Sequence, residues 1–163
     1  MKKAISLLIL LVFAAALTGC GFFSKTIKTD PGSVSFKGND GSTSQISVSG
    51  KEGESVALPD AYPKDLFPII DGATILMANR NEDANKKVTY WVTYTSDKAA
   101  KEIYDFYLGA YKDATESQKM ELSGTYSVSG IKSGQQFSTT ISSEDKDGKK
   151  VSTVMITIAP KSQ

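Results

Sequence analysis

The stretch Val88-Thr89-Tyr90-Trp91-Val92-Thr93-Tyr94-Thr95 is the clearest strand in the sequence. Successive side chains of a strand point to opposite faces of the sheet, so the valines and tyrosines share one face. The threonines share the other face with Trp91. The first face is apolar enough to form a core, and the second is polar enough to meet water. The stretch therefore predicts a half-buried strand that places Trp91 on a partly exposed surface.

An amphipathic helix is predicted directly after this strand. Ser96 stands where an N-cap residue is wanted, Asp97 falls in the first turn, and the helix is expected to end near Tyr111. Its apolar residues recur at steps of three and four, namely Ala99, Ile103, Phe106, Tyr107 and Ala110. Tyr104 and Tyr111 fall at the edges of this stripe, where we expect each hydroxyl to reach water. A membrane-surface helix is the alternative, but the polar face carries acids and no basic cluster.

Further strands are predicted on both sides of this pair. The segment Ala73–Ala78 is a short apolar strand, and residues 79–87 form a polar turn region before Val88. Three alternating strands are expected after the helix, at Met120–Ser129, Gln135–Ser142 and Val151–Ala159. The predicted fold class is α+β, with an antiparallel sheet of about four to six strands and one amphipathic helix packed on one face. The expected order is β-β-α-β-β-β after an N-terminal hairpin.

That hairpin is predicted from a weaker alternation. Val34 and Phe36 point one way, residues 39–41 offer an Asn-Asp-Gly turn, and Ile46 and Val48 resume the alternation. A two-stranded hairpin is marginal by itself. We therefore expect it either to dock on the main sheet or to remain mobile.

The first residues indicate export through a bacterial secretory signal. Lys2 and Lys3 supply a positive end, and residues 4–17 supply an apolar core broken only by Ser6. The run Leu17-Thr18-Gly19-Cys20 then resembles the lipobox of lipoprotein precursors. That resemblance implies that the sulfur of Cys20 takes a diacylglycerol and that the chain is cut just before it. The mature protein would then be anchored in the cell membrane on its extracytoplasmic side.

Two alternatives to a lipidated Cys20 stay open. A retained membrane anchor is disfavoured because the apolar core is shorter than the roughly 20 residues that span a bilayer as a helix. A secreted protein would keep an unpaired thiol in an oxidising place, since Cys20 is the only cysteine. The domain organisation is thus expected to be a signal peptide at 1–19, a lipidated tether at 20–32, the hairpin and a polar linker at 33–54, and the α+β domain at 55–163.

A proline-rich segment precedes the strands of the main domain. Three of the five prolines fall between positions 59 and 68, so this segment is predicted to be neither a regular helix nor a central strand. We expect it to cross the core as an ordered, extended chain. The alternative is an aromatic and proline-lined ligand groove.

The same segment carries a resemblance. Its pairs are Leu58-Pro59, Tyr62-Pro63, Phe67-Pro68-Ile69 and Gly72-Ala73. This arrangement is similar to a motif of uncharacterised bacterial envelope lipoproteins, which place it just before a strand-helix-strand module. The resemblance covers about Val34 to Pro160 and implies only the fold and the location in the cell envelope. It supplies no catalytic or ligand-binding residues.

The sequence offers little material for catalysis. Histidine is absent, which removes the usual general base and the commonest metal ligand. The stretch Asp145–Gly148 resembles part of a calcium loop, but the EF-hand frame would place Val154 where a bidentate glutamate is required. Ser127 and Ser129 near Lys132 are a chance grouping in a chain rich in serine and lysine. We therefore predict no catalytic residue, no metal site and no cofactor.

Three classes of function remain open. The favoured one is a lipid-tethered, non-catalytic binding module that engages an envelope protein, a peptide or a glycan. Its candidate surface is the sheet edge or the face with Trp91, together with Tyr62. A structural envelope component and an enzyme without a recognisable motif are the alternatives. Nucleic acid is not an expected partner, because Arg80 is the only arginine and the lysines are spread among acids.

Overall fold

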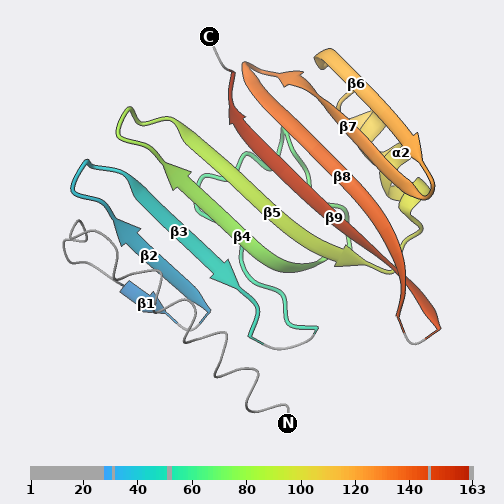
Figure 1. Ribbon diagram of the computed structural model, residues 1–163, viewed down its shortest axis with the longest axis horizontal. Helices are drawn as coiled ribbons and strands as arrows, with labels where there is room; N and C mark the ends of the chain where they lie inside the picture. Colours follow the sequence, from blue (N-terminus) through green and yellow to red (C-terminus); the bar gives the residue numbers. More distant parts are fainter. Residues whose placement is uncertain (1–27, 31, 51–52, 147, 162–163) are drawn as a thin grey trace.

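The computed structural model describes residues 28–30, 32–50, 53–146 and 148–161. They form one antiparallel sheet of nine strands in the order β1-β2-β3-β4-β5-β9-β8-β7-β6, with helix α2 on one face (Figure 1). The elements are β1 Lys28–Asp30, β2 Ser33–Lys37, β3 Thr43–Val48, β4 Thr74–Glu82, β5 Val88–Ser96, α2 Ala100–Ala110, β6 Thr115–Leu122, β7 Thr125–Lys132, β8 Gln135–Lys146 and β9 Lys149–Pro160. The α+β class agrees with the prediction, but the sheet has more strands than the predicted four to six.

One additional strand comes from a turn that the sequence pattern hides. The predicted strand Met120–Ser129 is in fact the end of β6 and the start of β7. Ser123 and Gly124 have φ angles of 47° and 83°, and two such residues close the tightest kind of β-hairpin. The order after the helix is therefore four strands rather than three.

The N-terminal hairpin docks on the main sheet. Strand β3 pairs with β4 from Thr43 opposite Glu82 to Val48 opposite Met77. Residues 79–82, predicted as part of a polar turn, therefore belong to β4. Their backbone is paired on both sides, and this pairing outweighs their polar composition. Strand β1, which pairs with β2, lies within the segment expected to be a tether.

The proline-rich segment lies behind the sheet and is free of regular strand or helix, as predicted (Figure 1). It is not extended as expected, because the N–H groups of Tyr62 and Phe67 donate to the carbonyls of Pro59 and Pro63 and close successive turns, for which proline presets the φ angle. Tyr62, Phe67 and Ile70 are all buried against the sheet and α2. The segment therefore belongs to the core layer, which is the structural interpretation of its prolines.

Two tyrosine hydroxyls hold the backbone of this segment in place. The hydroxyl of Tyr90 on β5 donates to the carbonyl of Ala61 at 2.9 Å. The hydroxyl of Tyr107 on α2 donates to the carbonyl of Pro68 at 3.1 Å and also contacts the Tyr94 hydroxyl at 2.8 Å. The two tyrosines therefore link the strand, the helix and the proline-rich segment into one unit.

The helix begins later than predicted. Its N-cap is Ala99, which has no side chain to cap with, and Ser96 is the last residue of β5. The Ser96 hydroxyl instead accepts the N–H of Lys98 at 3.3 Å. The prediction of Ser96 as N-cap was wrong because the strand continues one residue further than its alternation suggests.

A buried lysine donates a hydrogen bond to a backbone carbonyl at the C-terminal end of the helix. Lys132 on β7 donates to the carbonyl of Ala110 at 2.7 Å and to the carboxylate of Asp113 at 2.6 Å. A cation there complements the negative end of the helix dipole. The Lys132 ammonium also lowers the pKa of the Asp113 carboxyl.

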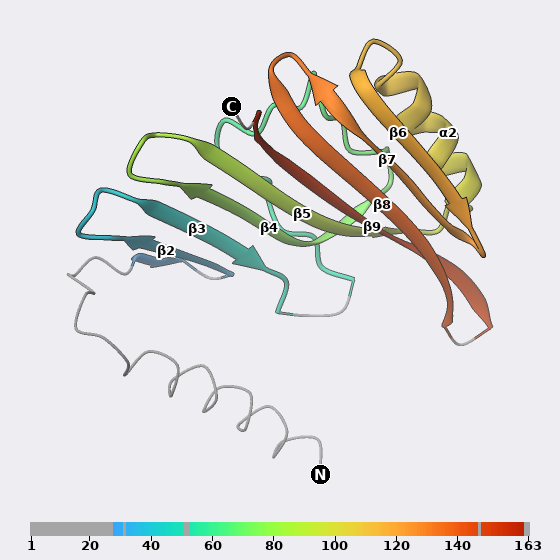
Figure 2. The same ribbon diagram turned by 45° about the horizontal axis from the view of Figure 1, so that its top comes forward.

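Tyr104 and Tyr111 are both buried as whole residues. The Tyr111 hydroxyl lies in the interior, which contradicts the prediction that it reaches water. The helix packs against β7 and β8, so the apolar stripe is wider than its spacing suggests (Figure 2). The Tyr111 hydroxyl finds a partner in the Thr139 hydroxyl at 3.2 Å, and its ring lies 4.3 Å from that of Phe137.

Candidate binding surface

The face of the sheet opposite the helix, called the open face below, has its centre on β5. The valines and tyrosines of β5 are buried from position 90 to 94, whereas its threonines and Trp91 are partly exposed. The two faces predicted from the alternation of this strand are therefore confirmed. Strand β5 is the fifth of nine, so Trp91 lies near the middle of the open face.

Strand pairing arranges the open face in rows that run across the strands. The Met120 row consists of Val48, Met77, Thr93, Met155, Thr140, Ser127 and Met120. The Trp91 row consists of Val34, Ile46, Asn79, Trp91, Thr157, Ser138, Ser129 and Gln118. Strands lie about 4.8 Å apart, so the Met120 row, which crosses seven strands, is about 29 Å long.

The exposed apolar side chains gather on this face. Five large apolar side chains of the described residues are more than a third exposed, and all five point to the open face: Val48, Met77, Met120, Leu122 and Met155. Four of them belong to the Met120 row. Methionine is flexible and polarisable, so it adapts to the surface of a partner.

The two rows carry no charge. Charged residues make up 23% of the chain, yet none of the fifteen residues in the two rows is charged. The outer surface of α2 shows the opposite character, with ion pairs of Lys98 with Glu102 and of Lys101 with Asp105. The absence of charge from these two rows therefore distinguishes the centre of the open face from the solvated surface of the same domain.

The structure does not bring Trp91 and Tyr62 together. Trp91 lies on the open face, between Asn79 and Thr157 of the neighbouring strands. Tyr62 is only 6% exposed and lies under the other face, where its ring meets that of Tyr90 edge-on at 5.6 Å. Tyr62 therefore adds nothing to a surface around Trp91.

Two buried oxygen atoms, those of the Tyr62 hydroxyl and the Asn79 side-chain amide, have no hydrogen-bond partner among the described residues. The Tyr62 hydroxyl is buried and has no hydrogen bond within the described part of the chain. Burial raises its pKa well above the ordinary range for tyrosine. The Oδ1 atom of Asn79, beside Trp91 in the Trp91 row, is likewise buried without a partner among the described residues.

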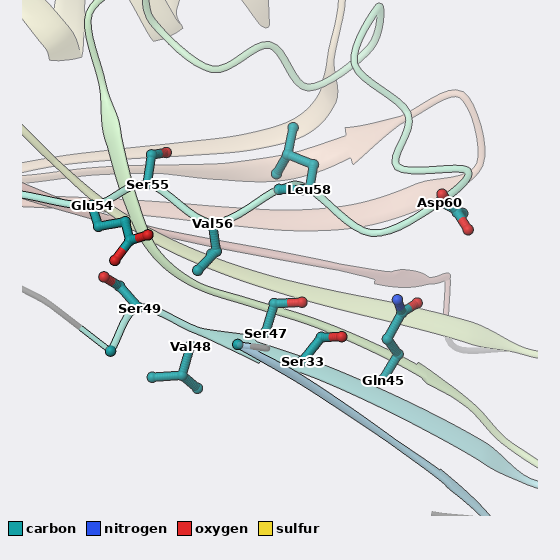
Figure 3. Close-up of a pocket in the computed structure, with 13 residues that line it drawn as sticks. Ser33, Gln45, Ser47, Val48, Ser49, Glu54, Ser55, Val56, Leu58 and Asp60 are labelled. Carbon is teal, nitrogen blue, oxygen red and sulfur yellow. The ribbon is translucent and has the colours of Figure 1, made fainter. Parts of the chain in front are cut away.

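A groove of about 610 Å³ lies on the covered side, between β2, β3 and the start of the proline-rich segment. Figure 3 shows the side chains of Ser33, Gln45 and Ser47 pointing toward that segment. Glu54 and Asp60 also line the groove, and both are exposed. Among the described residues, its lining contains hydroxyls and carboxylates but no lysine or arginine. This described lining therefore offers no cationic or imidazole partner for a serine nucleophile.

The other features considered for chemistry lie apart. Ser127 and Ser129 point to the open face, whereas Lys132 is buried on the other side under the end of α2. No group of three or more acidic or cysteine side chains is gathered for a metal in the described residues. The Asp145 carboxylate accepts the N–H of Gly148 at 3.0 Å, as in a turn.

Cys20 and the predicted signal peptide lie outside the described residues, so the signal peptide and the lipidation both stay predictions. Within the described ranges, no helix is both long and apolar enough to cross a bilayer.

Comparison with protein-family profiles, with curated proteins and with solved structures gives no match for this chain. The choice among functions therefore depends on the chemistry of the open face.

Proposed function

We propose that the protein is a lipid-anchored, non-catalytic binding module of the bacterial cell envelope, and that its open face binds a neutral glycan. The observation that carries this proposal is the uncharged pair of rows around Trp91. The proposal also includes anchoring in the cell membrane through acylated Cys20, on the extracytoplasmic side.

The composition of the open face favours a glycan over a charged partner. Eight of the fifteen residues in the two rows carry hydroxyl or amide groups, which both donate and accept hydrogen bonds. The hydroxyls of a sugar need such groups, and its C–H surface packs on an aromatic ring such as that of Trp91. Anionic polymers and charged peptides instead need ionised side chains to pair with. A neutral, flat and hydroxyl-rich partner therefore fits these rows best.

The anchoring part of the proposal is tested by metabolic labelling with a palmitate analogue. We expect the wild-type protein to carry the label and to fractionate with membranes. Cys20→Ala should carry none, because Cys20 is the only cysteine. An unlabelled wild-type protein in the culture medium would exclude the anchor.

The binding part is tested through the fluorescence of Trp91, the only tryptophan. We expect the emission to change on titration with a neutral oligosaccharide such as chitohexaose or cellohexaose. Trp91→Ala should weaken binding about 30-fold, which corresponds to about 2 kcal/mol for a central aromatic contact. Because this variant has no tryptophan, its affinity is measured by calorimetry.

A pair of serine substitutions controls for general effects of charge. Ser138 lies in the Trp91 row and Ser133 lies in the turn between β7 and β8, and both are exposed. Ser138→Lys should weaken binding at least tenfold, whereas Ser133→Lys should leave it unchanged. Equal effects of the two variants, or no response to any neutral glycan, would exclude the open face as a glycan site.

A further inference from the structure

The last strand of the sheet has a free edge. Strand β6 pairs with β7 on one side only, and no described strand pairs with its other side. All eight of its residues are exposed, including the apolar Met120 and Leu122. A free edge presents unpaired N–H and C=O groups that can accept another strand.

Proteins usually block such an edge with bulges and charges, and β6 has both. Its bulge is confined to the start of the strand, between Thr115 and Gln118. From Gln118 to Leu122 the strand keeps regular register with β7. The charges in this regular part are Lys119 and Glu121, which flank Met120 and have opposite signs.

Opposite signs around one central residue favour pairing of β6 with a second copy of itself. In an antiparallel pair with its two-fold axis at Met120, Lys119 lies opposite Glu121 of the second copy, and Glu121 lies opposite the second Lys119. Opposite charges placed directly across a pair stabilise it by about 0.2–1 kcal/mol, and like charges destabilise it. The charges of this edge therefore favour self-pairing in that register.

The neighbouring registers are disfavoured. In an antiparallel pair, residues directly opposite each other point to the same face. For the open faces of the two copies to be continuous, the two-fold axis must therefore pass through a residue and not between two neighbouring residues. An axis at Lys119 places two lysines opposite each other, and an axis at Glu121 places two glutamates opposite each other. Only the axis at Met120 brings opposite charges together.

The helices leave room for this arrangement. Helix α2 packs against β7 and β8, at the end of the sheet that β6 and β7 form (Figure 2). The two β7 strands would lie three strand spacings apart, about 14 Å. Helices pack at 8–10 Å, so the two copies of α2 would not collide.

We propose that the protein forms a two-fold dimer by antiparallel pairing of its β6 edges around Met120. The Met120 rows of the two copies then join into one row across a single continuous sheet. This inference does not depend on what the open face binds. The dimer would have an open face twice as wide as that of one copy.

Cysteine substitutions in the full chain, expressed in its own host, test the register. Position 120 lies opposite itself in the dimer, so Met120→Cys should form a disulfide-linked dimer on a non-reducing gel. Leu122→Cys is the matched control, because Leu122 is exposed on the same face of the same strand. The two copies of residue 122 would be about 14 Å apart, too far for a disulfide.

The charges give a second, independent test. In the Met120→Cys background, Lys119→Glu places glutamates opposite each other and should reduce the linked dimer at least tenfold. Adding Glu121→Lys reverses both charges, restores the complementary pairs and should recover the dimer. The wild-type chain, whose only cysteine is Cys20, shows how much disulfide-linked dimer forms without an added cysteine. Equal linking at positions 120 and 122, no linking at position 120, or no rescue by the charge reversal would each overturn the proposal.

Discussion

Raising the pH above about 10 is expected to unfold this protein cooperatively, within about two pH units. Four buried tyrosines are responsible: Tyr62, Tyr94, Tyr107 and Tyr111. Burial disfavours the charged phenolate and raises the pKa of each hydroxyl, to about 12 for Tyr94. In the unfolded chain these hydroxyls titrate near about 10.

The direction of this pH effect follows from the number of protons that the folded and unfolded states bind. Below pH 10 both states keep the four protons, and the contribution of these groups to stability is constant. Above pH 10 the unfolded chain releases protons that the folded chain retains, so the free energy of unfolding falls as the pH rises. Above pH 10 each tyrosine lowers the free energy of unfolding by about 1.4 kcal/mol per pH unit, and the four together lower it by roughly 5–6 kcal/mol per pH unit. Domains have only about 5–15 kcal/mol of stability.

Alkaline titration followed by circular dichroism and by the ultraviolet absorbance of tyrosinate measures this effect. The tyrosinate signal of these four residues, out of seven tyrosines in the chain, should appear together with the loss of circular dichroism, because the buried hydroxyls ionise only when the chain unfolds. A tyrosinate signal that reaches its full value while the circular dichroism stays native would show that the four tyrosines are accessible, contrary to the structure.

Tyr62→Phe is the control for this titration. The Tyr62 hydroxyl makes no hydrogen bond within the described residues, so its removal should leave the stability at neutral pH within about 1 kcal/mol of wild type. The alkaline slope should fall by about 1.4 kcal/mol per pH unit, and the midpoint should move to higher pH.

The sequence predicted the parts of the fold that depend on local periodicity. The two faces of β5 followed from alternation alone, and Ile103 and Tyr107 of α2 are buried as their spacing indicated. The turn at Ser123 and Gly124 was missed because the alternation through Leu122 and Tyr126 continues across it. In the structure the two-residue loop breaks this alternation, because Leu122 lies opposite Thr125 and shares its face, which puts Tyr126 on the other face.

The candidate surface was predictable only in part. Alternation placed Trp91 on an exposed face, but the Met120 row depends on the register between strands far apart in the sequence. No local pattern specifies that Met77 and Met155 lie two strands apart in one row. Likewise, the sequence showed that the segment with Tyr62 is too apolar for water, but it carried no signal for which face that segment covers.

Phe67→Ala is expected to destabilise the protein by about 3–5 kcal/mol. Phe67 is fully buried in the proline-rich segment, and its ring lies 5.6 Å from that of Phe137 and 5.9 Å from that of Tyr111. Truncation removes apolar contacts and leaves a cavity between the sheet and α2. Urea unfolding followed by circular dichroism measures the change, and the slope with denaturant should stay that of wild type.

Phe36→Ala is the matched control, because the same side chain is only half-buried on β2. Its cost should be less than half that of Phe67→Ala, since less apolar surface leaves the protein interior. The comparison also decides between the two interpretations of the proline-rich segment. A core segment loses stability on truncation of Phe67, whereas a ligand groove could lose Phe67 at a cost of less than about 1 kcal/mol. Equal costs for the two variants would therefore contradict the placement of this segment in the core.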